Sequence, residues 1–297
     1  AASFILDAET RLPALDAISR RILGISVPDI TDHSITVGNL RTRLKETPQN
    51  PLAWVDLARA YTVVNEKEKS ENAMWAALRY SHNHRWVSRM AARLFVHYEE
   101  ISKAHKVLLM NSNLRSDPWL LSTELAVARL AEKPQKNWNQ AKKLADSKLA
   151  PIHLSELTSS LATSEILNGA DKKARLFFKQ SLISPTSNSL AQIKWADRSF
   201  KLGFSKQIES SLSHTSKAHE AKHWEAYEKK QMHLALEHAH NWLKEEPYSA
   251  SPPQAITYIA SIINNMHLVL ETSVNGLKVN PGDTTLKLNY IFAQLST

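Results

Sequence analysis

Apolar residues recur along this chain at the spacing of helix faces, and short polar breaks separate one run from the next. Within 51–78, for example, the apolar positions return every three or four residues, which is the period of a helix half-buried against a neighbour. We find no run of alternating β-branched residues bounded by turn pairs, which is the pattern of a strand. The chain also has only six glycines. These observations predict an all-α fold.

Two helices are predicted before the first regular stretch. One runs from Phe4 to Leu23 and ends at Gly24. The other runs from about Val37 to Lys45 and ends before Pro48, because the residue preceding a proline is pushed out of the α region.

The unusual residues of 51–78 return later in the chain. Trp54, Leu57, Ala58 and Tyr61 follow the spacing W-x2-L-G-x2-Y. Comparable sets are Ala91, Ala92 and Phe95; Leu125 and Ala126; Leu161, Ala162, Gly169, Ala174 and Phe178; and Trp195 with Ala196. This pattern resembles the tetratricopeptide repeat, a 34-residue helix-turn-helix unit. The resemblance implies a right-handed α-solenoid of about five to six hairpins that acts as a protein-binding scaffold.

Small residues at these positions have a physical purpose. Antiparallel helices approach to about 8 to 10 Å only where the facing side chains are small. We assign this role to Ala58, Ala92, Ala162, Ala174 and Ala196.

The repeat pattern suggests three segments. An N-terminal helical segment covers 1–48, the N-terminal half of the repeats covers 49–209, and the C-terminal half covers 210–297. The Ser-rich stretch Ser210–Ser216 is expected to be the joint between the halves, with the H-E-x-x-H sequence that follows it lying between repeats. The last repeat spans Pro253 to Pro281, and Thr284–Leu295 is a lone helix that either caps the solenoid or begins a further repeat.

Composition narrows the functional classes. The 297 residues, 43% of them apolar, suffice for a continuous core, and the absence of cysteine excludes disulfides, thiol catalysis and Cys-based zinc sites. No segment has the roughly 18 unbroken apolar residues of a membrane span. We predict a cytoplasmic protein, although a cysteine-free chain fits the periplasm as well.

The net charge of +8 is concentrated in one region. From Arg79 to Lys148, thirteen Lys and Arg stand against six Asp and Glu. Within this region Arg85, Arg89, Arg93 and His97 recur every fourth residue and so form a stripe on one helix face. Arg59 occupies the position of Arg93 one repeat earlier.

Like charges at this spacing repel one another, so we expect a partner to offset them. The resemblance implies that Arg89 and Arg93 match ligand-facing positions, which favours an acidic peptide or a phosphate as partner. The alternative is a solvated face paired with Glu99, Glu100 or the acidic residues of 66–71. Open solenoid ends would also allow self-association or assembly with other subunits.

Nucleic acid is an alternative partner. The basic region also contains Trp86, Tyr98, Trp119 and Trp138, and such a combination could hold phosphates and stack bases. Those positions belong mostly to the repeat core or its turns, however, so we expect protein binding instead.

One motif points to catalysis. His219-Glu220-Ala221-Lys222-His223 is a literal H-E-x-x-H, which resembles the zinc metalloproteases, with Glu245 or Glu246 as third ligand. Lys222 places a charge within a motif that apolar residues usually flank. The sequence has no phosphate-binding glycine loop and no G-x-S-x-G elbow. We therefore predict a non-enzyme without a metal or other cofactor.

Overall fold

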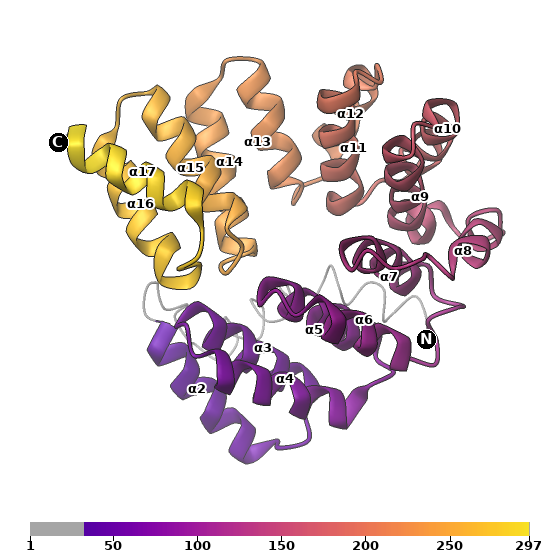
Figure 1. The fold of residues 1–297 in the computed structure, drawn as a ribbon, viewed down its shortest axis with the longest axis horizontal. Helices are drawn as coiled ribbons and strands as arrows, with labels where there is room; N and C mark the ends of the chain where they lie inside the picture. The colour runs from indigo at the N-terminus through magenta and orange to yellow at the C-terminus, as the bar shows by residue number, and fades with distance from the viewer. Residues whose placement is uncertain (1–32, 297) are drawn as a thin grey trace. The chain divides into compact units, whose positions relative to one another are not determined.

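The computed structural model describes residues 33–296, and within that range every regular element is a helix. The described residues confirm the all-α prediction. The predicted helix Phe4–Leu23 lies outside them. The chain divides into two compact units, the first ending at Ser81 and the second beginning at His82 (Figure 1).

The first unit contains three helices: α2 (His33–Glu46), α3 (Pro51–Val63) and α4 (Lys67–Ser81). Asn50 caps α3 by accepting hydrogen bonds from the backbone N–H groups of Leu52 and Ala53, and Pro51 supplies the favourable first-turn proline. Helix α2 begins earlier than predicted but ends before Pro48, as expected. The α3–α4 hairpin is tightened by the buried hydroxyl of Ser70, which donates to the carbonyl of Ala58 at 2.8 Å.

The second unit contains the remaining helices. They are α5 (Arg85–His97), α6 (Ile101–Met110), α7 (Pro118–Leu130), α8 (Trp138–Ala145), α9 (Pro151–Leu167), α10 (Asp171–Ser181), α11 (Ser187–Phe200), α12 (Ser205–His214), α13 (His219–Glu228), α14 (Met232–Glu245), α15 (Ser251–Ile262), α16 (Met266–Val279) and α17 (Thr284–Ser296).

Consecutive helices form antiparallel pairs, and in the second unit the first helices from α5 to α13 stack on one another. Helices α5, α7, α9, α11 and α13 contact each other in that order, and each also packs against the second helix of its own pair (Figure 1). From α3 to α16 there are seven pairs, not the five to six expected. Helix α17 then packs on α15 and α16, and whether it caps the solenoid or begins a further repeat stays a prediction.

The additional pair, α11 with α12, arises because Ser210–Ser216, which was expected to be a joint, is mostly helical. Most of it belongs to α12, which buries Ile208 and Leu212 against the core of the preceding repeats. Serine has a modest helix propensity, and burial of the two apolar side chains outweighs it. Whether the repeats divide into an N-terminal and a C-terminal half at 209/210 stays a prediction.

The alanines assigned to close helix contacts are buried. Ala58, Ala92, Ala162, Ala174 and Ala196 each have no solvent exposure. In the third pair the assigned phase was wrong by one residue, because Ala126 is exposed and Glu124 and Leu125 are buried instead. Trp195 is also exposed, beside the buried Ala196.

Candidate functional site: the basic stripe of helix α5

Helix α5 carries the predicted stripe on the face opposite its core. Its buried face consists of Val87, Ser88, Ala91, Ala92, Leu94 and Phe95. The four stripe residues Arg85, Arg89, Arg93 and His97 lie outside this set at i, i+4 spacing. The pattern therefore placed them on one face correctly, and tertiary contacts decide what each side chain meets.

Arg85 binds the acidic cap of the next first helix. Its Nε donates to Oδ2 of Asp117 at 2.6 Å, while Oδ1 of Asp117 accepts from the backbone N–H of Trp119 at 2.9 Å and that of Leu120 at 3.2 Å. One carboxylate thus caps α7 and binds the first stripe arginine.

Arg89 makes the most buried ion pair of the stripe that the described residues show. Its Nη2 donates to Oε2 of Glu156 on α9 at 2.5 Å, and its Nε donates to the hydroxyl of Thr123 at 3.2 Å. The guanidinium also lies 5.1 Å from the ring centroid of Trp119, a cation–π contact. Asn188 donates to the other oxygen of Glu156 at 2.9 Å, so this carboxylate joins α5, α9 and the start of α11.

Arg93 and His97 contact a segment far along the chain. Arg93 forms an ion pair with Glu246, just after α14, and the His97 ring lies 5.2 Å from the ring of Tyr248. Burial alone would lower the pKa of Arg93, but the adjacent Glu246 carboxylate outweighs it and the pKa is raised. The Arg93 side chain remains 48% exposed, against 17% for Arg89.

A second carboxyl belongs to the Arg93 cluster. Burial, followed by the negative charge of Glu246, raises the pKa of Glu220 on α13 to about 7, while Arg93 acts in the opposite direction. Glu220, Glu246 and Arg93 therefore interact electrostatically, and the raised pKa of Glu220 brings its titration near neutral pH.

Arg59 belongs to the first unit. It lies on α3, and its guanidinium is 3.9 Å from the carboxylate of Asp56, one helical turn earlier. Its place in α3 is that of Arg93 in α5, nine residues into each helix.

The chain's own carboxylates thus offset much of the repulsion between stripe cations. Asp117, Glu156 and Glu246 were not among the acidic residues that sequence spacing suggested, because they lie 32, 67 and 153 residues from their partners. The sequence offered one weak indication of these partners. Asp117 precedes a proline at a predicted helix start, where an acidic cap is common.

The spacing of the first helices identifies the repeat. They begin at Pro51, Arg85, Pro118, Pro151, Ser187, His219, Ser251 and Thr284, at intervals of 32 to 36 residues. Each of the first seven is followed by a second helix that packs against it. This is the tetratricopeptide-type fold.

No known protein-family model and no curated protein matches this chain. Among solved structures it is similar to three tetratricopeptide-type examples. In the complex of Cut9 with Hcn1 from the APC/C, the identity is 12% over 89% of this chain and 46% of that chain, with a TM-score of 0.40. For PilF of Pseudomonas aeruginosa, the identity is 12% over 83% of this chain and 97% of PilF, with a TM-score of 0.37. YrrB is described as a TPR protein with an unusual peptide-binding site. Its identity to this chain is 12% over 84% of this chain and 96% of YrrB, with a TM-score of 0.27. This chain spans about half the length of the first.

The H-E-x-x-H motif lies within a repeat of this tetratricopeptide-type fold, not between repeats as expected. It opens α13, the first helix of the sixth pair. His223 is fully buried, and its Nδ1–H donates to the carbonyl of Ala235 at 2.9 Å. His219 instead faces His238, with 3.5 Å between their Nδ1 atoms. Within residues 33–296, no group of three His, Asp or Glu side chains is placed to hold a metal ion.

The aromatic residues of the basic region are packed, as the repeat position suggested. Trp119 is buried, and Trp86, Tyr98 and Trp138 are half-buried. No helix within 33–296 is long and apolar enough to cross a bilayer.

Proposed function

We propose that this chain is a non-enzymatic protein-binding scaffold that holds an acidic, extended segment of a partner protein along the basic stripe. The stripe residues are Arg85, Arg89, Arg93 and His97, with Arg59 in the equivalent place of the first unit. The observation that carries the proposal is that three successive arginines of α5 each bind a carboxylate. The geometry of the stripe therefore suits the functional group that an acidic peptide presents.

A carboxylate of the partner can replace one of the chain's own most easily at the Arg93–Glu246 pair. Its side chains are 48% and 23% exposed, whereas those of Arg89 and Glu156 are 17% and 5% exposed. A partner carboxylate that replaces Glu246 would form an equivalent ion pair, so the exchange itself is nearly neutral. Further contacts of the partner would then make binding favourable.

This competition predicts opposite effects for two substitutions. Arg93→Glu removes the cation and should abolish binding of an acidic peptide. Glu246→Gln removes the competing carboxylate and should tighten binding about fivefold, because a half-exposed ion pair contributes up to about 1 kcal/mol. Glu271→Gln, which removes an exposed carboxylate on α16, is the matched control and should change nothing.

The test is a fluorescence anisotropy titration with a short labelled peptide of alternating Glu and Ala, beside the same peptide with Gln in place of Glu. We expect the Glu peptide alone to bind, with the order of affinity Glu246→Gln above wild type above Arg93→Glu. Equal binding of both peptides, or no change in Arg93→Glu, would place the partner surface elsewhere. Stoichiometric zinc in the purified protein, lost on His223→Ala, would overturn the non-enzyme part of the proposal.

A further inference from the structure

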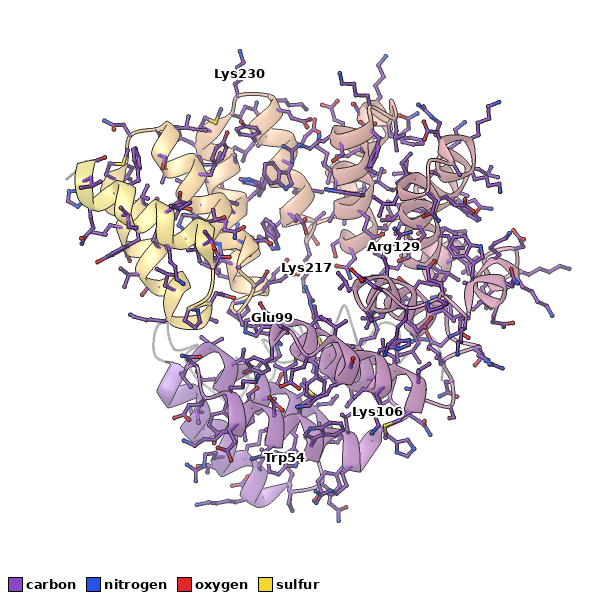
Figure 2. All side chains as sticks on the ribbon, in the orientation of Figure 1. Trp54, Glu99, Lys106, Arg129, Lys217 and Lys230 are labelled. Atoms are coloured by element: carbon purple, nitrogen blue, oxygen red, sulfur yellow. The ribbon has the colours of Figure 1, made fainter. Side chains whose placement is uncertain are left out.

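The second helices α6, α8 and α10 carry a cluster of exposed cations that the stripe does not include. Figure 1 shows α8 beside α7 and α10 beside α9, with both second helices on the same side of the row of first helices. We define the lysine face as the exposed residues Lys106, Arg115, Lys133, Lys136, Lys142, Lys143, Lys148, Lys172, Lys173 and Lys179. Lys106 is labelled on α6 in Figure 2.

Acidic residues of the same stretch of chain do little to neutralise this face. Glu124, Glu156 and Glu165 lie on the first helices and are buried. The exposed acidic residues between 101 and 181 are Glu132, Asp146 and Asp171. Within residues 33–296, no member of the lysine face forms an ion pair. The positive charge of this region therefore acts on the solvent, in contrast to that of the stripe.

Aliphatic side chains are exposed among these lysines. On α10, Leu176 is 59% exposed, and Lys172, Lys173 and Lys179 lie within one helical turn of it. Ile183 lies two residues after the end of α10 and is 69% exposed. The other exposed apolar side chains of this region include Leu109 and Met110 on α6, Leu149 after α8, and Ile152 at the start of α9. Apolar groups that project between cations suit a surface that is anionic at its boundary and apolar just below it.

We propose that the lysine face binds the surface of a lipid bilayer that contains anionic headgroups. Juxtaposed lysines are attracted by the negative surface potential of such a bilayer, and the aliphatic side chains can enter the headgroup region between them. The chain would lie on the bilayer, without a spanning helix from residues 33–296.

The composition of the face favours lipid over nucleic acid. Arginine is favoured over lysine where phosphates are recognised specifically, because its guanidinium binds them in a bidentate way, but Arg115 is the one arginine among the residues defined as the lysine face. Single strands are bound by bases stacked on aromatic rings. The large apolar side chains exposed between 101 and 183 in the structure are all aliphatic or Met.

The test is co-sedimentation of the full chain with vesicles of phosphatidylcholine alone and with about 30% phosphatidylserine added. We expect binding to the anionic vesicles only, and weakening as salt rises from about 0.01 M to 0.1 M, because the screening length shortens. The variant Lys142→Glu/Lys143→Glu/Lys172→Glu/Lys173→Glu should reduce partitioning roughly a hundredfold or more.

A matched variant keeps the net charge change but spares the face. Lys230, Lys244, Lys278 and Lys287 are exposed on the α13–α14 turn and on α14, α16 and α17, and Lys230 projects away from its hairpin (Figure 2). Changing these four to Glu should leave most of the binding intact. Equal losses in both variants would mean that only net charge acts, and would overturn the proposal.

The apolar contribution separates lipid from nucleic acid. Leu176→Asn/Ile183→Asn should lower vesicle binding several-fold, whereas attraction of an RNA oligonucleotide by charge alone would not depend on these two side chains. Vesicle binding unaffected by this variant, or tight RNA binding without vesicle binding, would refute the lipid assignment. Because the lysine face and the stripe share no residue, either proposal can fail without the other.

Discussion

Glu156 offers the sharpest test of how the stripe is held. Its side chain on α9 is 5% exposed and accepts hydrogen bonds from Arg89 at 2.5 Å and Asn188 at 2.9 Å. Glu156→Ala removes the carboxylate that faces the Arg89 guanidinium. Breaking a buried ion pair by removing one partner typically costs about 3 to 5 kcal/mol. Since Thr123 and Trp119 still contact Arg89, we expect the lower value, about 3 kcal/mol.

The assay is heat unfolding followed by circular dichroism at neutral pH. For a unit of this size, about 3 kcal/mol should lower the Tm by roughly 6 to 12 °C. The double variant Arg89→Met/Glu156→Met replaces both charges with apolar groups, and such replacements are often neutral. We therefore expect the double variant to be more stable than Glu156→Ala. A loss in the double variant equal to the sum of the losses in Arg89→Met and Glu156→Met would show that the two side chains are not coupled, and would refute the reasoning.

Three further predictions test the core and its charges. Ala174→Leu should cost about 1 to 3 kcal/mol in urea unfolding because position 174 is fully buried, whereas Ala126→Leu, at an exposed position, should cost little. Burial and a neighbouring carboxylate raise the pKa of Glu220 to about 7, so the stability it contributes is complete below about pH 4.5 and is lost as the pH rises through 7. Glu220→Gln should therefore gain about 2 kcal/mol relative to wild type between pH 5 and pH 8, and parallel pH profiles of the two proteins would contradict this. Lys194 is 1% exposed and donates to Glu225 at 2.6 Å, so Lys194→Ala should lower the urea midpoint clearly more than the loss of an exposed lysine does.

Local sequence was enough to predict the helices and much of the repeat. Proline marks the starts at Pro51 and Pro118, and small residues such as Ala162 mark where helices meet, because both effects depend on a few neighbouring residues. The same information placed the stripe on one face of α5, since side-chain direction in a helix follows from spacing alone.

Register and repeat number depended on packing between helices. In α7, Leu125 and Ala126 both suit the repeat position, and only the contacts of the folded chain show that the buried pair begins one residue earlier, at Glu124. There Glu124 meets His105 of the preceding helix at 3.0 Å. Helix α12 was missed because its serines suggest a loop, whereas burial of Ile208 and Leu212 stabilises the helix.

The sequence by itself therefore determined the fold class, most of the helical pairs and the side on which the arginines of α5 lie. Only the tertiary structure decided which carboxylates those arginines meet, since Asp117, Glu156 and Glu246 lie 32, 67 and 153 residues further along the chain. It also decided which of the chain's cations face solvent without an ion pair among the described residues. The physical reason is that helix formation follows local spacing, whereas the electrostatic environment of a side chain is set by whatever the fold brings within a few ångströms of it.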